Sequence, residues 1–150
     1  MIQAEMVRTP LDPGVILRKV GHPEDGAVLL FLGVVRNHAD GRRVAGMRYD
    51  AYEAMATEVL SAIAAEAAER LGTDRLAVVH RVGDLDVGEP SVAIAVSSPH
   101  RAEAYDASRY VIEEIKKRLP VWKKERYVEG GEAWVEGSVP PVKAGKAGGS

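Results

Sequence analysis

The sequence contains no cysteine. This absence excludes a disulfide framework, a metal site with thiolate ligands and a cysteine nucleophile, so any sulfur that the protein handles must be brought by another molecule. Aromatic residues are also scarce, at 5% of the chain. They are too few to form an evident platform on which nucleic-acid bases would stack.

Long apolar runs and a strong net charge are missing as well. No run approaches the roughly 20 residues that span a bilayer, and the N-terminus lacks the basic and apolar segments of a signal peptide. The formal net charge is −2 and the pI is about 6.1, which argues against a general nucleic-acid binder. We therefore expect a soluble, cytoplasmic protein that binds neither membranes nor nucleic acids.

The chain does have an ordinary globular composition, with 46% hydrophobic and 28% charged residues in a length of 150. A chain of this length forms one domain and removes roughly 70% of its unfolded surface from water on folding. We place this single domain at residues 1–137. Residues 138–150 are rich in Gly, Pro, Ala and Lys, and we expect a flexible tail there.

Apolar periodicity and turn residues predict helices and strands that mix without a regular repeat. Helices are expected at residues 12–20, 53–71 and 99–118, and strands at 2–6, 27–35, 44–52, 76–80, 91–96, 122–128 and 133–136. This order indicates an α+β fold with a mixed or mostly antiparallel sheet. The run 27–35 is almost continuously apolar, which is typical of a strand buried on both faces. Residues 36–43 are expected to form a polar loop, and 83–88 a turn.

Basic residues concentrate at the end of the third predicted helix, although the whole chain is slightly acidic. The segment from Lys116 to Arg126 holds six Lys or Arg residues and one acid. Pro120 ends the helix and turns the chain back, which can bring Lys123 beside Lys116. Two ammonium groups held close together lower the pKa of at least one of them, and such a lysine can act as an acid, a base or a nucleophile. The simpler interpretation is a solvated helix end that interacts with the helix dipole.

Two further element ends carry cationic side chains. His100 and Arg101 lie where the third helix begins, at a junction suited to an anion; alternatively, Ser98 caps the helix and Arg101 is exposed. Arg36 follows a predicted apolar strand and is either a functional group at a strand end or a solvated charge. If the fold brings these ends together with Lys116, they form an anion pocket sized for a phosphorylated metabolite.

The histidines offer no second kind of site. The four of them lack the spacing of metal ligands with one another or with carboxylates, so neither a metal nor a bound cofactor is expected. His80 stands at the end of a predicted strand next to Arg81, and we favour a structural role for it.

Five segments, in order, resemble the large-subunit family of molybdopterin synthase. They are residues 31–38 (FLGVVRNH), 79–85 (VHRVGDL), 97–101 (SSPHR), 116–125 (KKRLPVWKKE) and 134–136 (WVE). The lysine segment is the specific one, because it matches the pattern K-x-R-x-P-x-W-K-(K/R)-E of that family. The resemblance covers most of residues 1–137.

The resemblance implies an α/β hammerhead-type fold and a homodimer that carries one small ubiquitin-like sulfur carrier at each end, a heterotetramer in total. The C-terminal Gly-Gly thiocarboxylate of the carrier enters a pocket on the large subunit. Its sulfur is transferred twice to cyclic pyranopterin monophosphate, which creates the dithiolene of molybdopterin during molybdenum cofactor biosynthesis. The implied activity is that of a sulfurtransferase.

The same resemblance implies roles for particular residues. Lys116 is the expected catalytic lysine, with Lys123 beside it. The pterin and its phosphate are expected to contact Arg36, His100, Arg101, Lys116, Lys123, Lys124 and Glu125, with Val34 and Val35 lining the pocket. According to the resemblance, the partner protomer can supply the His100–Arg101 pair.

Three alternatives remain open at this point. The first is a non-catalytic anion- or RNA-binding module that uses the basic patch between Lys116 and Arg126. The second is an enzyme in which Lys116 forms a Schiff base with a carbonyl substrate. The third is a purely structural interaction protein, which leaves the three cationic element ends unexplained.

Overall fold

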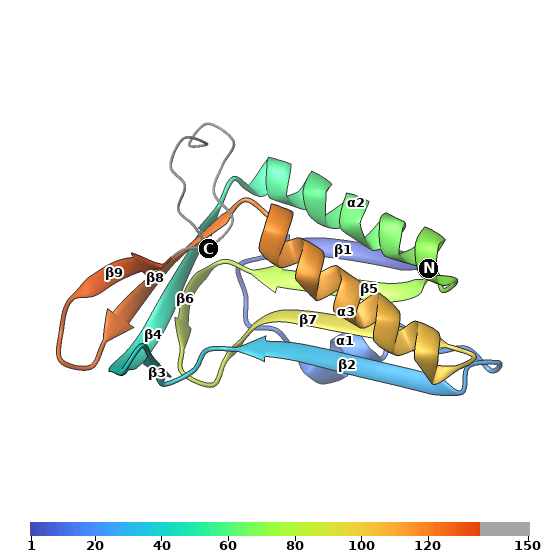
Figure 1. Ribbon diagram of the computed structural model, residues 1–150, viewed down its shortest axis with the longest axis horizontal. Helices are drawn as coiled ribbons and strands as arrows, with labels where there is room; N and C mark the ends of the chain where they lie inside the picture. The colour runs from blue at the N-terminus through green and yellow to red at the C-terminus, as the bar shows by residue number, and fades with distance from the viewer. Residues whose placement is uncertain (136–150) are drawn as a thin grey trace.

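The computed structural model describes residues 1–135, which form two sheets and three helices (Figure 1). The elements are β1 (Ile2–Val7), α1 (Pro13–Leu17), β2 (Ala27–Val34), β3 (His38–Ala39), β4 (Arg42–Ala51), α2 (Glu53–Leu71), β5 (Arg75–Arg81), β6 (Gly83–Asp86), β7 (Pro90–Ser98), α3 (Arg101–Arg118), β8 (Val121–Tyr127) and β9 (Glu132–Val135). The tail predicted at 138–150 lies outside the described residues. No helix within residues 1–135 is long and apolar enough to cross a membrane.

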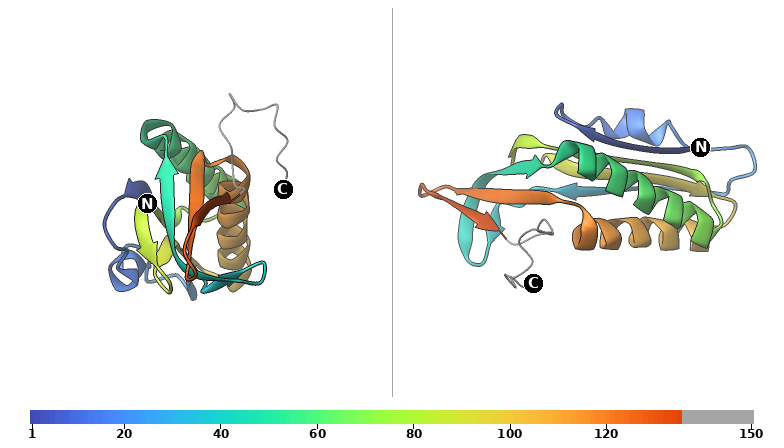
Figure 2. Two further views of the ribbon diagram at one scale, coloured as in Figure 1. Left: turned by 90° about the vertical axis from the view of Figure 1, so that its left-hand side faces the viewer. Right: turned by 90° about the horizontal axis from the view of Figure 1, so that it is seen from above.

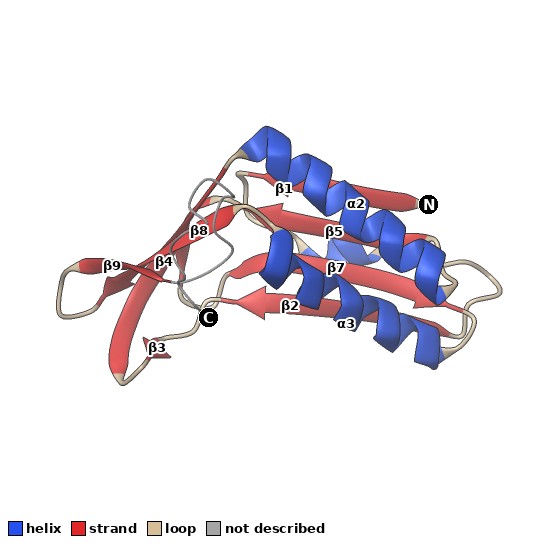
Figure 3. Ribbon diagram, turned by 45° about the horizontal axis from the view of Figure 1, so that its top comes forward, coloured by secondary structure: helices blue, strands red, loops and turns tan. Residues whose placement is uncertain are grey.

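The first sheet has the strand order β1–β5–β7–β2. β1 is parallel to β5, whereas the other neighbours are antiparallel. α2 and α3 lie across one face of this sheet, and α1 packs on the other (Figures 2 and 3). The second sheet has the order β3–β4–β8–β9, with β6 paired to β4, and extends from one end of the first (Figure 1). The predicted α+β fold with a mixed sheet is confirmed.

The main core lies between the helices and the two central strands. Side chains alternate between the two faces of a strand, so Leu76 and Val78 of β5 face Leu60 of α2 and Val111 of α3, all fully buried. Ala77, between them, packs on the side of α1. Burial of each such Leu or Val side chain contributes about 1.5–3 kcal/mol, so this layer fixes the position of α3.

β2 differs from its sequence-based description. The prediction that residues 27–35 are buried on both faces is wrong, because β2 is an edge strand with a hydrogen-bonded neighbour on one side only. Val28, Phe31 and Val34 are 50%, 36% and 49% exposed. The central strands β5 and β7 are buried on both faces, whereas β2 has apolar side chains that residues 1–135 leave exposed.

The corner after α3 follows the prediction. α3 ends at Arg118, and Leu119 already has extended backbone angles, φ −72° and ψ 123°. Pro120 cannot continue a helix, and β8 begins at Val121. The end of the helix and the start of the strand are therefore held close together.

Two short strands lie where the sequence predicted only loop and turn. β6 lies within the expected turn 83–88, and β3 within the expected loop 36–43. Both pair with the long strand β4. Its backbone supplies hydrogen-bonding partners that local sequence patterns do not reveal.

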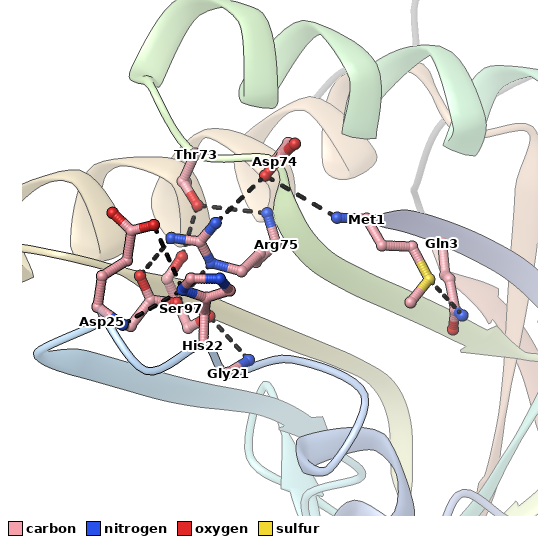
Figure 4. A network of polar contacts seen from close by, with 10 residues as sticks. Met1, Gln3, Gly21, His22, Asp25, Thr73, Asp74, Arg75 and Ser97 are labelled. Atoms are coloured by element: carbon pink, nitrogen blue, oxygen red, sulfur yellow. Dashed lines mark hydrogen bonds and ion pairs between the residues drawn. The ribbon is translucent and has the colours of Figure 1, made fainter.

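A buried polar network secures the opposite end of the first sheet (Figure 4). The side chain of Asp25 is 1% exposed. It accepts hydrogen bonds from Arg75 Nε at 2.6 Å and from Ser97 Oγ at 2.7 Å. The hydrogen bond from the Arg75 guanidinium is the main reason that the pKa of Asp25 lies below its usual value. This network attaches the loop before β2 to β5 and β7.

Candidate active site

A cavity of about 620 Å³ opens at the junction of the two sheets, a size typical of small-molecule sites. Its lining comes from the end of β2, the segment 35–40 that follows it and includes β3, the C-terminal half of α3, and strands β4, β5, β7, β8 and β9. The charged and polar lining residues are Arg36, His38, Asp40, Tyr49, His80, Ser91, Lys116, Lys123 and Glu125. Three of the cations expected from sequence therefore share one cavity.

Lys116 and Lys123 reach the cavity from the two sides of the corner at Pro120. Lys116 lies in the last turn of α3. Along β8, Val121, Lys123 and Glu125 alternate onto the cavity face. Burial, followed by the charge of Lys116, lowers the pKa of Lys123, and Arg36 adds to the effect, whereas Glu125 opposes it. A lysine in this setting gives up its proton more readily than a solvated one.

Arg36 is held at the cavity by the backbone before it. Val35 N donates to Glu89 O at 3.1 Å, and Gly88 N donates to Val35 O at 2.8 Å. Glu89 in turn lies 3.3 Å from the guanidinium of Arg81. Arg36, Val34 and Val35 all line the cavity. The hydrogen bonds of Val35 to Gly88 and Glu89, in the loop after β6, therefore fix the backbone position from which the Arg36 side chain extends.

Glu125 is a buried carboxylate among these cations, only 8% exposed. Tyr127 Oη donates a hydrogen bond to Glu125 Oε1 at 2.7 Å. The charge of Glu125 acts on Lys123. Because a buried charge needs a partner, Glu125 balances part of the positive charge of the cavity lining.

The inner wall of the cavity contains residues that the sequence did not single out as functional, chiefly Tyr49, His80 and Ser91. The rings of Tyr49 and His80 meet edge to face, with centroids 5.5 Å apart. Burial raises the pKa of Tyr49, and Ser91 Oγ donates a hydrogen bond to Gly33 O at 3.3 Å. His80 was assigned a structural role in a buried strand. Its position at a strand end next to Arg81 is a signal shared with Arg36 and could have identified it.

Three of the residues expected at the substrate do not line the cavity. Lys124 points to the opposite face of β8, with Nζ 4.6 Å from the centre of the Trp134 ring and 3.5 Å from Glu132. His100 and Arg101 stand at the start of α3. At 1.5 Å per residue, Arg101 and Lys116 are about 22 Å apart along the helix axis. Within one chain, α3 separates the two cationic ends.

The chemistry of the cavity suits an anion better than a metal ion. No cluster of three or more His, Cys, Asp or Glu residues that could bind a metal occurs within residues 1–135. The cavity instead presents arginine and lysine side chains, which bind phosphate and carboxylate groups. The cavity therefore has the lining expected of a site for a small anionic molecule, with two lysines and an arginine among its residues.

Comparison with known proteins identifies the family. The model of the MoaE protein family matches residues 6–118, and the chain belongs to this family. It is 45% identical to the molybdopterin synthase catalytic subunit of Bacillus subtilis over 135 residues, which cover 90% of this chain and 85% of that protein.

Solved structures agree with this membership. Molybdopterin synthase from Staphylococcus aureus is 37% identical with a TM-score of 0.82, covering 88% of this chain and 96% of that one. A chain from the complex of subunits 1 and 2 of molybdopterin-converting factor from Helicobacter pylori has the same fold at 24% identity, with a TM-score of 0.73 and coverage of 95% and 97%. The prediction of a molybdopterin synthase catalytic subunit, and hence of an enzyme, is confirmed over the RNA-binding alternative.

Proposed function

We propose that the protein transfers sulfur from a thiocarboxylated, ubiquitin-like carrier subunit to cyclic pyranopterin monophosphate, at the cavity that contains Lys116 and Lys123. One observation supports this most directly: Arg36, Lys116 and Lys123 line a single cavity of about 620 Å³. The chain has no cysteine, so the sulfur must arrive on another molecule. Family membership supplies the class of reaction.

The lysines act where charge changes during the transfer. The thiocarboxylate sulfur attacks a carbon of the pterin substrate, a carbon–sulfur bond forms, and a carbon–oxygen bond breaks. Lys116 gives a proton to the departing oxygen. Water then hydrolyses the resulting thioester and returns the carrier as a carboxylate. Lys123 and Arg36 stabilise the negative charge of phosphate and thiocarboxylate throughout.

The remaining lining residues shape the pocket. Val34 and Val35 provide apolar contacts for the pterin, and Glu125 orients Lys123 through the opposite charge. We assign Lys124 a supporting role on the outer face of β8, because its side chain lies against Trp134.

The carrier approaches with its C-terminal tail. A Gly-Gly tail has no side chains and can enter a narrow cavity, and the cationic lining attracts its thiocarboxylate. The Helicobacter pylori relative is described as a complex of two subunits, which supports the same assembly here. We place this reaction in the cytoplasm.

A second copy of the chain completes the site in this proposal. His100 and Arg101 stand about 22 Å from Lys116 along α3, so they reach a lysine cavity only from a partner protomer. The exposed apolar edge of β2 supports such a dimer. Beside it lies a groove of about 340 Å³ lined by Leu29, Leu30, Phe31, Tyr105, Ser108, Arg109 and Ile112, a contiguous apolar surface of the kind that partners cover.

Subunit mixing tests the shared site. At a pterin concentration below saturation we expect Lys116→Ala and Arg101→Ala each to have much reduced activity alone, but dimers formed from both variants contain one intact site if Arg101 acts on the partner. After random exchange, about a quarter of the sites are restored. If the mixture gains no activity although the chains have exchanged partners, Lys116 and Arg101 belong to the site of the same protomer. That result would overturn this arrangement.

Reconstitution tests the reaction itself. The protein is mixed with thiocarboxylated carrier and the cyclic pterin, and molybdopterin is measured. We expect product only when all three are present. Product formed from inorganic sulfide at the same rate would show that the cavity does not require a carrier tail. Borohydride trapping of a substrate carbon on Lys116 would instead support the Schiff-base alternative.

A further inference from the structure

Tyr127 is the last residue of β8 and lies on the same face of that strand as two cavity residues. Side chains two positions apart in a strand share a face, so Lys123, Glu125 and Tyr127 follow one another along it. Lys123 and Glu125 line the cavity, and Tyr127 follows them outside its lining. None of the segments that carry the family resemblance includes Tyr127, and the proposed reaction does not use it.

The hydroxyl of Tyr127 is bonded to the neighbouring carboxylate. Tyr127 Oη donates to Glu125 Oε1 at 2.7 Å, a distance typical of a charge-assisted hydrogen bond to an ionised oxygen. This bond, followed by burial, raises the pKa of Tyr127. A phenol that keeps its proton more firmly remains a donor, so the bond persists across the neutral pH range.

The ring of Tyr127 is held in turn by the hairpin of β3 and β4. The guanidinium carbon of Arg42 lies 3.5 Å from the ring centre, and Arg42 Nε donates to Glu129 Oε2 at 3.0 Å. The backbone joins the same two segments, since Val128 N donates to Arg43 O at 2.9 Å. Contacts from two hairpins therefore fix the direction in which the hydroxyl points.

Lys123 is the cation nearest to this carboxylate along β8, yet the two are not paired. They are about 7 Å apart along the strand, a separation that their side chains can bridge. Among residues 1–135 the amine of Lys123 has no ion pair or hydrogen bond, and Glu125 acts on it only as a nearby charge. An anion that binds to this amine therefore has no carboxylate to displace.

We propose that Tyr127 is a positioning residue, whose hydroxyl holds the Glu125 carboxylate back from Lys123 and so keeps the amine available to an anionic ligand. Glu125 still offsets part of the positive charge of the cavity from where it is held. The use of the amine in sulfur transfer rests on the proposed function; the arrangement of the three side chains does not.

Glu125 is the group through which Tyr127 can act on the lysine. Burial and the charge of Lys116 lower the pKa of Lys123, and Arg36 contributes in the same direction, whereas the charge of Glu125 raises it. The other titratable side chains that line the cavity are His38, Asp40, Tyr49 and His80. A closer approach of Glu125 should therefore be visible as a rise in the pKa of Lys123.

NMR titration of labelled lysine tests the arrangement in the protein without substrate or carrier. Tyr127→Phe removes the hydroxyl but keeps the ring that Arg42 contacts. The released carboxylate can then approach Lys123, and the pKa of Lys123 should rise by about one unit. Tyr110→Phe is the matched control, because Tyr110 Oη donates to Glu66 Oε1 at 2.8 Å between α3 and α2. It should leave the titration of Lys123 unchanged.

A double substitution identifies the path of the effect. Glu125→Gln removes the charge and should by itself lower the pKa of Lys123. Adding Tyr127→Phe to that variant should cause no further change. The proposal is overturned by an equal rise in both backgrounds, by no rise in Tyr127→Phe alone, or by the same rise in Tyr110→Phe.

Kinetics extend the test to the reaction. In Tyr127→Phe the carboxylate competes with the substrate phosphate for Lys123, so KM for the pterin should rise about 3-fold at neutral pH with kcat nearly unchanged. A site that needs the ammonium form weakens as the pH rises through the lysine pKa, so the basic limb of the kcat/KM profile should move to higher pH. A lower kcat at constant KM with an unmoved profile would make Tyr127 a purely structural contact and overturn the proposal.

The positioning role and the proposed function fail separately. If the lysine titration shifts as expected in a protein that makes no molybdopterin, the proposed function is wrong and the arrangement around Lys123 stands. If the protein makes molybdopterin but Tyr127→Phe leaves the lysine titration unchanged, the positioning role is wrong and the proposed function stands.

Discussion

The two ends of the first sheet differ in whether their charged side chains have partners of opposite charge. At the end shown in Figure 4, Arg75 is paired with the buried carboxylate of Asp25; the pKa of the arginine is raised and that of the acid lowered. At the other end, the cations Arg36, Lys116 and Lys123 outnumber the carboxylates of Asp40 and Glu125. The pKa values of Lys123 and His80 are both lowered there. The Asp25–Arg75 pair favours the charged form of both groups and stabilises the fold. The cavity disfavours the charged forms of Lys123 and His80, and a bound anion would offset that unfavourable interaction.

The largest expected effect comes from removing a charge at the cavity end. Lys116→Ala should lower the rate of molybdopterin formation about 100-fold or more, because a positioned proton donor contributes at least that much. The unfolding temperature should change little, since the side chain lies at a helix end beside a cavity. Assays with thiocarboxylated carrier measure the first quantity and calorimetry the second. Wild-type turnover in this variant would remove Lys116 from the mechanism.

The next effect concerns substrate binding. Arg36→Ala should weaken pterin binding by about 1.5–3 kcal/mol, the contribution of one charge-assisted hydrogen bond. In the proposed dimer, Arg101→Ala should do the same. Isothermal titration calorimetry with the pterin gives both values. If both variants retain full affinity, the phosphate is not bound where we propose.

At the opposite end of the sheet, neutralising the carboxylate of Asp25 should lower the stability of the fold and leave the rate of sulfur transfer unchanged. Asp25→Asn should lower the unfolding temperature by about 5 °C, with little change in turnover by the folded enzyme. Asp74→Asn is the control, since Asp74 contacts the same arginine at 3.7 Å from an exposed position. Equal melting temperatures for the two variants would show that the buried pair contributes no more than the exposed one.

The pH dependence of that stability has a definite sign. The folded-state pKa of Asp25 is lowered, so its contribution is fully present above the unfolded value of about 3.9. It is lost as the pH falls through the lower, folded-state value. Denaturant melts of the wild type and Asp25→Asn should therefore converge in acid and separate toward neutral pH. A constant difference would assign the effect to packing.

The smallest effect is expected between the two ends, at the loop that holds Arg36. Glu89→Gln weakens the contact with Arg81 while keeping the backbone hydrogen bond to Val35 possible. We expect a rise in KM for the pterin of about 3-fold with kcat unchanged. A fall in kcat at constant KM would place Glu89 in the chemistry instead of in the support of Arg36.

The site residues whose positions could be predicted from sequence are those that belong to a local sequence pattern. Lys116, Pro120 and Lys123 form a local pattern, and the corner that it predicts is present. Arg36 could be placed at a strand end for the same reason. By contrast, the neighbours of β2 depend on strand order, so its apolar sequence was taken for a central strand. His80 enters the cavity wall through pairing with distant strands, which no local spacing encodes.

Lys124 shows that sequence alone does not tell which residues of a single segment line the cavity. The resemblance placed Lys123, Lys124 and Glu125 together at the substrate, yet successive residues of a strand face opposite sides. Lys123 and Glu125 line the cavity, and Lys124 lies on Trp134. Strand alternation alone distinguishes these residues once β8 is assigned, but it does not say which face is the inner one.

The short corner between α3 and β8 also bears on how this sequence can evolve. Only Leu119 and Pro120 separate the helix from the strand. One inserted residue would reverse the faces of β8, turning Lys124 inward and Lys123 outward without disturbing the helix. Substitutions at this corner alter packing, but a change in its length exchanges the residues of the site. Insertions and deletions should therefore be purged here by selection and tolerated in the turn between β8 and β9.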